Sequence, residues 1–186
     1  NGGIYVGSDK SDTSLTLTNA TVDATNSQVA QNLDTLVENL SQYKPFQNIN
    51  VDAFSDLAVA MYGTTQDTLA LNNSTVTGDI GIMNEKGQTN LSFTNNSVVN
   101  GNVTLSGNST NTFLVDNSTI NGDLNASQNS GDTTITLQNG ANVDGNITTG
   151  AGNDTVVLVN DSHVTGNVTG GDGDDTLSMD AGSSIS

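Results

Sequence analysis

The stretch Ile120-Asn121-Gly122-Asp123-Leu124 decides the fold, because its pattern of apolar, polar, glycine, polar and apolar residues recurs along the chain. The pattern returns at residues 143–147 and 164–168, and two earlier copies lie at 76–80 and 99–103. Successive glycines are 23, 21, 23 and 21 residues apart. A fixed period of this length is typical of a solenoid built from stacked units.

Each repeat also carries a second apolar pair with one residue between its members. Both segments alternate as strands do, with one face inward and one outward. At least two strands per turn predict an all-β parallel β-helix of about 22 residues per coil. Stacking in register would give two interior columns and a glycine column, where the missing side chain permits either a bend or a tight interior. The first interior column holds Val76, Val99, Ile120, Val143 and Val164, and the second holds Ile80, Val103, Leu124, Ile147 and Val168.

An asparagine recurs two residues after the second apolar pair. At one angular position of successive coils, such residues could form a side-chain ladder. Asparagine also tolerates the left-handed backbone of a sharp turn, and this alternative explains each residue by itself. The ladder prediction comprises Asn73, Asn95, Asn117, Asn139 and Asn160.

The period breaks once, between Ala24 and Gly78, which are 54 residues apart. We therefore predict a first coil over 1–24, an inserted α-helical hairpin over 25–66 and further coils over 67–186. Residues 27–42 have the spacing of an amphipathic helix, and a second short helix would place Phe54, Leu57, Ala58 and Met61 on one face. The hairpin either packs on the coils or binds a partner through its tip. The tip residues are Tyr43, Lys44, Phe46 and Asn48.

The charge balance excludes some partners. The net charge is −17, with three lysines and no arginine. Nucleic acids and anionic membrane surfaces both attract lysine and arginine, so neither is an expected partner. The chain begins and ends within a repeat, which predicts a piece cut from a longer array.

Acidic residues near the end of the chain suggest a metal site. Residues 170–177 match the calcium-binding pattern Gly-Gly-x-Gly-x-Asp-x-apolar. Calcium prefers six to eight oxygen ligands. However, residues 154 and 175 are a whole coil apart, and we favour an Asx-type turn that opens the Asp-Thr strand. The candidate ligands are Asp154, Asp172, Asp174 and Asp175.

Catalysis has little support in the sequence, and we expect no enzyme. His163, the single histidine, fits an exposed turn residue. Carboxylates beside the glycine column could serve a carbohydrate-cleaving β-helix, which is the alternative function. These carboxylates are Asp23, Asp79, Asp123 and Asp144.

The Asn-Ser-Thr-Val/Ile-x-Gly-Asp runs, the Gly-x-Gly-Asn-Asp-Thr segment at Gly150, the absence of cysteine and the acidic balance resemble passenger domains of Gram-negative autotransporters, particularly AIDA-I-like adhesins. The resemblance implies a right-handed β-helix on the bacterial outer-membrane surface, without a cofactor. It also implies binding to a host matrix protein or glycan, or to further copies of the chain. The alternative is a polysaccharide-processing enzyme or a calcium-stabilised structural module. Candidate binding residues on the solenoid are Asn100, Asn121, Asp123, Asp144 and Thr165.

Overall fold

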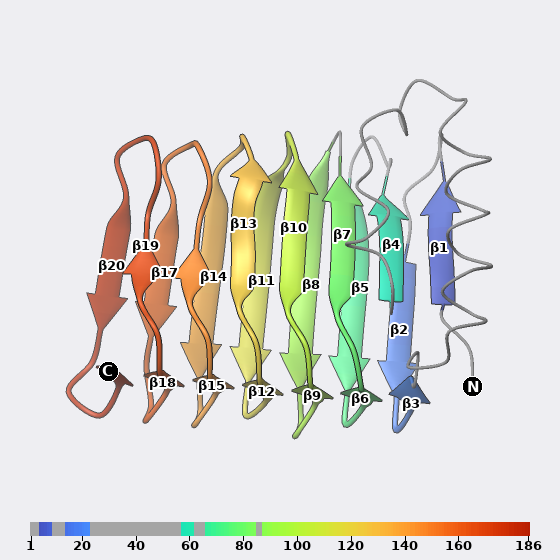
Figure 1. Ribbon diagram of the computed structural model, residues 1–186, viewed down its shortest axis with the longest axis horizontal. Coiled ribbons are helices and arrows are strands. Elements are labelled where there is room, and N and C mark those ends of the chain that lie inside the picture. Colours follow the sequence, from blue (N-terminus) through green and yellow to red (C-terminus); the bar gives the residue numbers. More distant parts are fainter. Residues whose placement is uncertain (1–3, 9–13, 23–56, 62–65, 85–86) are drawn as a thin grey trace.

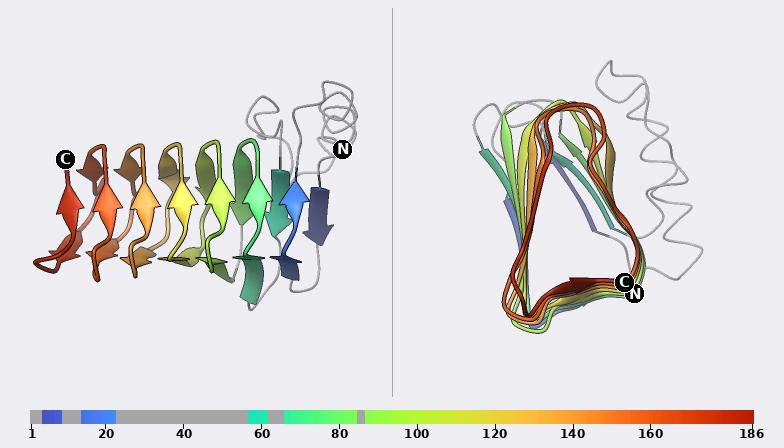
Figure 2. Two further views of the ribbon diagram at one scale, coloured as in Figure 1. Left: turned by 90° about the horizontal axis from the view of Figure 1, so that it is seen from below. Right: turned by 90° about the vertical axis from the view of Figure 1, so that its left-hand side faces the viewer.

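The computed structural model describes residues 4–8, 14–22, 57–61, 66–84 and 87–186. Within these residues the chain forms three parallel sheets of seven strands each, and no helix. Each coil contributes one strand to every sheet. In Figure 2, viewed along the long axis, the sheets form the three sides of a triangle. The predicted β-solenoid is therefore confirmed.

Sheet A holds the first strand of each coil: β1 (Ile4–Ser8), β4 (Leu57–Met61), β7 (Ile80–Asn84), β10 (Val103–Gly107), β13 (Leu124–Asn129), β16 (Ile147–Thr148) and β19 (Val168–Thr169). Sheet B holds the second: β2 (Ser14–Thr18), β5 (Gln66–Asn72), β8 (Gln88–Thr94), β11 (Thr110–Asp116), β14 (Thr133–Gln138), β17 (Thr155–Leu158) and β20 (Thr176–Met179). Sheet C holds the third: β3 (Thr21–Val22), β6 (Thr75–Val76), β9 (Val98–Val99), β12 (Thr119–Ile120), β15 (Asn142–Val143), β18 (His163–Val164) and β21 (Ser184–Ile185). The chain runs up sheet A, down sheet B and across sheet C while it advances along the axis, which is the right-handed sense expected of parallel crossovers (Figure 1).

Both predicted interior columns are present. Val99 pairs with Val76 and Ile120 in sheet C, and Val103 pairs with Ile80 and Leu124 in sheet A. Sheet B supplies the remaining apolar residues, including Phe93 and Phe113, whose rings meet edge to face with centroids 4.9 Å apart. These side chains form one continuous buried core along the axis.

The glycine column marks the corner between sheets C and A. The expected single strand over 120–124 is divided there: Ile120 ends β12, and Leu124 begins β13. Successive coils approach closely at this corner, since a Cβ on Gly145 would lie 2.6 Å from the Gly122 carbonyl oxygen. Only glycine fits this spacing without a backbone shift. The structure thus has three strands per coil, because this corner separates two short strands.

One predicted helix is wrong in its described part. Leu57, Ala58 and Met61 belong to strand β4, which pairs with β1 and β7. The solenoid therefore resumes at residue 57 rather than at 67. The apolar spacing of this segment also fits a strand, and pairing with Ile4 and Ile80 decides between the two. Apart from strand β4 and Gln66 at the start of β5, the residues predicted to form the hairpin lie outside the described residues.

Candidate functional site

Charge is confined to particular positions of the coil. The described acidic residues occupy the corners and connecting turns or lie inside the solenoid, and none lies in the middle of an outward sheet face. Those outside the core are Asp79, Asp116, Asp123, Asp132, Asp144, Asp161, Asp172, Asp174, Asp175 and Asp180. The outward faces are therefore uncharged areas bordered by acidic edges.

Sheet B presents the longest of these uncharged faces. Its outward side chains are small and bear hydroxyl, amide or methyl groups. Thr112, Thr134, Thr155 and Thr176 lie in register on four successive strands. Adjacent strands of a sheet are about 4.8 Å apart, so the column repeats its hydroxyl groups at this interval. A second outward column runs parallel to it and comprises Ala70, Ser92, Leu114, Thr136, Val157 and Ser178.

Four of the five predicted solenoid binding residues share a column. Asn100, Asn121, Asp144 and Thr165 each follow the last residue of a sheet C strand, and all four are exposed. The Asn121 amide nitrogen donates to the Asn100 side-chain oxygen at 2.7 Å. The structure thus places these four along one edge, while Asp123 lies two residues further on, beyond the glycine corner.

Asp123 belongs to a different column, in which side chains link successive coils. Its Oδ1 accepts a hydrogen bond from the Asn146 backbone N–H at 2.7 Å. In the same way, Oδ1 of Asp79 accepts from the Asn102 backbone N–H at 2.6 Å. Oδ1 of Asn146 accepts from the Asn167 backbone N–H at 2.9 Å. Asp79 and Asp123, the two carboxylates that directly follow the glycine, therefore stabilise coil stacking, and Asn102 separates them along the column.

The predicted asparagine ladder combines with left-handed turns. All five of its residues have positive φ, between 46° and 57°. Two side-chain hydrogen bonds join equivalent residues: Asn73 donates to Asn19 at 2.6 Å, and Asn160 to Asn139 at 3.3 Å. Between the other coils, the asparagine amide donates to a residue next to the equivalent asparagine. Asn95, for example, donates to the side chain of Asn72 rather than to that of Asn73, at 3.0 Å. The left-handed backbone of the asparagine itself is thus uniform along the column, and the side-chain ladder is not.

A buried serine column was missed at the sequence level. The Ser97 hydroxyl accepts from the Ser74 N–H at 3.2 Å and donates to the Thr94 carbonyl oxygen at 2.7 Å. Likewise, the Ser118 hydroxyl accepts from the Ser97 N–H at 3.1 Å, and the Ser183 hydroxyl accepts from the Ser162 N–H at 3.2 Å. The available signal was a serine that directly follows the turn in most repeats. Each hydroxyl satisfies a backbone group of the preceding coil, so the column secures the stacking.

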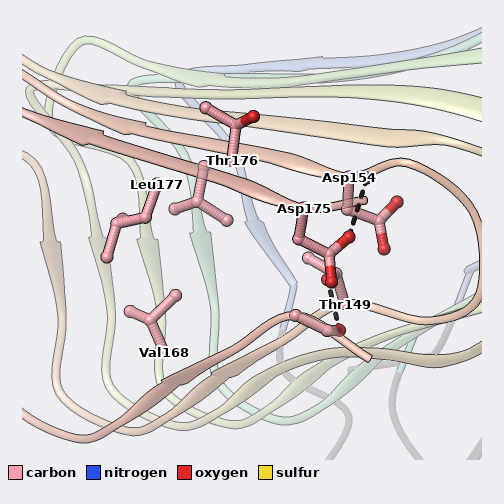
Figure 3. Close-up of a pocket in the computed structure, with 8 residues that line it drawn as sticks. Thr149, Asp154, Val168, Asp175, Thr176 and Leu177 are labelled. Atoms are coloured by element: carbon pink, nitrogen blue, oxygen red, sulfur yellow. Dashed lines mark hydrogen bonds between the residues drawn. The ribbon is translucent and has the colours of Figure 1, made fainter. Parts of the chain in front are cut away.

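Two of the four candidate calcium ligands, Asp154 and Asp175, line an open cavity of about 130 Å³ at the C-terminal end (Figure 3). Asp154 is 2% exposed, and its carboxylate oxygens accept from the Thr133 and Gly150 N–H groups at 2.7 and 3.1 Å. Asp175 accepts from the Asp154 N–H at 3.0 Å. In the described part of the chain no three acidic or histidine side chains are grouped so that they could hold a metal ion. Asp172 and Asp174 remain candidates from the sequence pattern alone.

The same cavity has apolar walls. Val156, Val168 and Leu177 line it beside the two carboxylates, as Figure 3 shows for the last two. Leu177 and Met179 point toward the core side of sheet B but are 52% and 49% exposed. They mark where the described coils end.

Hydrogen bonds lower the pKa of the Asp180 carboxyl. A hydrogen bond from the Asn160 backbone N–H lowers its pKa below the ordinary 3.8, and the Ser183 hydroxyl contributes in the same direction. The distances are both 2.7 Å. Asp180 thus acts as a turn carboxylate that joins the last two coils.

The predicted hairpin-tip residues Tyr43, Lys44, Phe46 and Asn48 lie outside the described residues. Among the residues that the structure describes, no helix has the length and apolar character needed to cross a membrane. Comparison of the chain with protein-family models, curated proteins and solved structures gave no significant match. The functional argument therefore rests on the geometry and chemistry of the solenoid.

Proposed function

We propose that this chain is part of a cell-surface adhesin on the outer membrane of a bacterium. In this proposal it binds a host matrix protein or glycan, or a second copy of itself, through the outward face of sheet B. The observation that supports this choice is the position of the charges. A molecule with net charge −17 has here a broad face on which the one described acidic residue, Asp116, lies at the edge where β11 ends. Its hydroxyl groups repeat at the strand spacing.

Such a face suits adhesion for two physical reasons. Hydroxyl and amide groups on a rigid sheet form hydrogen bonds at a lower ordering cost, because the paired strands already fix the backbone that carries them. Each contact is weak, but many identical contacts along a rod, repeated over a cell surface, act together. The acidic corners would repel strongly anionic partners, which favours neutral glycans and proteins of low or positive charge.

The experiment compares two faces of the same molecule. The purified chain is tested for binding to immobilised matrix proteins, neutral glycans and itself. Thr134→Glu with Thr155→Glu introduces charge into the sheet B face, while Asn121→Glu with Thr165→Glu introduces the same charge into the edge column. Circular dichroism and unfolding curves check that both variants retain the solenoid.

We expect the sheet B variant to lose binding and the edge variant to retain it. The reverse result would place recognition on the edge column predicted from the sequence. If both variants bind like the original chain, the sheet B proposal is wrong. A chain that binds none of these partners, and does not self-associate, would contradict the adhesin proposal itself.

A further inference from the structure

A buried polar zone runs along the inside of the corner between sheets A and B. In the coils of β7, β10 and β13 the last residue of the sheet A strand faces a residue near the start of the sheet B strand, and the larger of the two comes alternately from sheet A and from sheet B. Asn129 at the end of β13 faces Thr133, and its amide nitrogen donates to the Thr133 hydroxyl at 3.2 Å. In the coil before it, Gly107 ends β10 and Asn111 occupies the facing position on β11. In each of these two coils, one asparagine side chain thus fills the zone.

Two side-chain oxygens in this zone receive no hydrogen bond from the protein. They are Oδ1 of Asn111 and Oδ1 of Asn129, and the two residues are 1% and 2% exposed. Both amide nitrogens donate to the same acceptor, the Ser109 carbonyl oxygen, at 2.9 and 3.1 Å. The two side chains are therefore neighbours, one coil step apart.

The orientation of these amides is fixed by their donors. The Asn129 nitrogen also donates to the Gly131 carbonyl oxygen at 2.6 Å. Turning the amide over would bring its oxygen against the Ser109 and Gly131 carbonyl oxygens, which repel it. The same holds for Asn111 against Ser109. The unpaired oxygens thus belong to the stable orientation of both side chains.

No protein donor makes a hydrogen bond to either oxygen. The N–H group of Thr133, which pairs with Asn111, and that of Gly150 on the coil after Asn129 already donate to the Asp154 carboxylate. The described residues include no lysine or arginine. Buried polar groups in folded proteins almost always find a partner, frequently an ordered water.

We infer that Asn111 and Asn129 form a buried binding site for a water molecule, which donates its two hydrogens to the two Oδ1 atoms. The unsatisfied groups are two acceptors, and a single water offers two donors. A calcium ion is a poorer fit, because it needs six to eight oxygen ligands and the Asp154 oxygens are engaged elsewhere. The bound water would fix the stacking of the two central coils from inside.

A crystal structure at about 1.5 Å or better, with the unfolding temperature measured in EDTA, NaCl and CaCl2, tests this site. We expect a solvent peak within hydrogen-bonding distance of both oxygens, occupied in every crystal, and an unfolding temperature that the ions leave unchanged. A peak at metal-ligand distances with a rise in unfolding temperature in CaCl2 or NaCl would replace the water by a cation. The absence of any peak would overturn the site.

A pair of variants gives a second measurement in the crystal. Asn111→Leu keeps the number and branching of the side-chain heavy atoms and removes one of the two acceptors, together with the hydrogen bond to the Ser109 carbonyl oxygen. Because the loss of that hydrogen bond alone lowers the unfolding temperature, the variant is assessed by its solvent peak at the same resolution. We expect the peak to disappear, since Asn129 alone offers the water a single acceptor, and an unchanged peak would contradict a site shared by both oxygens. Asn90→Leu, on the outward face of neighbouring strand β8, is the control for leucine in a sheet B strand and should keep the peak.

Discussion

Gly122 lies so close to Gly101 that a Cβ added to Gly122 would stand 2.6 Å from the Gly101 carbonyl oxygen. The same relationship holds between Gly166 and Gly145, at 2.7 Å. The glycines of the repeat therefore allow the backbones of successive coils to meet at the corner between sheets C and A. The period by which the sequence identifies the solenoid is a direct consequence of this contact.

Gly122→Ala should destabilise the solenoid. The new Cβ would collide with the Gly101 carbonyl group, and neither that group nor the backbone at residue 122 can move without disturbing the adjacent coils. Overpacking of this kind typically costs about 1–3 kcal/mol of unfolding free energy. Urea unfolding followed by circular dichroism measures the loss. Gly140→Asn is the matched control, since a Cβ there meets nothing within 4 Å and asparagine tolerates its φ of +74°. Equal stability of the two variants would show that the close contact is not what requires glycine.

The serine column allows a prediction in both directions. Ser97→Ala leaves the buried Ser74 N–H without its acceptor, which should cost about 1–3 kcal/mol. Ala141 occupies the equivalent position in the next coil after Ser118, as the hydrogen bond from Asn142 to the Ser118 carbonyl shows. Ala141→Ser would supply the missing hydroxyl and should stabilise the fold by about 0.5–1.5 kcal/mol. Chemical denaturation of both variants checks the signs, and a destabilised Ala141→Ser protein would contradict the proposed role of the column.

The glycines and apolar columns could be predicted because they repeat at a fixed interval, and each repeat faces the same environment. Strand β4 could not, since Leu57, Ala58 and Met61 fit a helical spacing as well as a strand. Its pairing with Ile4 and Ile80 involves residues far apart in sequence. The serine column could not be predicted for another reason, which is that serine is usually exposed. Only the stacking of the coils shows that Ser74, Ser97 and Ser118 are buried. Asn111 and Asn129 differ in their place within the repeat, so no period pointed to them.

Asp154 provides a test of the calcium alternative. Its carboxylate oxygens already bind two backbone N–H groups, so we expect Asp154→Ala to destabilise the fold by about 2–4 kcal/mol with or without calcium. Differential scanning calorimetry in EDTA and in millimolar CaCl2 measures this. A calcium-dependent rise in the unfolding temperature of the unaltered chain, absent from the Asp154→Ala protein, would favour the calcium-stabilised module instead.

The lowered pKa of Asp180 predicts a pH effect on the last coil. The ionised carboxylate is favoured in the folded chain, first by the Asn160 N–H and then by the Ser183 hydroxyl. The folded pKa lies below the ordinary value of 3.8, so the stabilisation is present above pH 3.8 and is lost as the pH falls through the folded pKa. Carbon-13 NMR titration of the Asp180 carboxyl measures the pKa directly. Ser183→Ala should raise it toward 3.8, and an unchanged value would show that the hydroxyl has no such effect.

Salt should strengthen association between copies if the sheet B face is the contact. Two chains of net charge −17 repel each other, and the acidic corners border the proposed interface. The Debye length falls from about 30 Å at 0.01 M to about 8 Å at 0.15 M salt, so the repulsion weakens while short-range hydrogen bonds remain. Sedimentation velocity over this range should show a shift toward dimers and larger species. The Thr134→Glu, Thr155→Glu protein should stay monomeric throughout. Dissociation of the original chain with rising salt would indicate an interface held by opposite charges, which the uncharged face of sheet B does not offer.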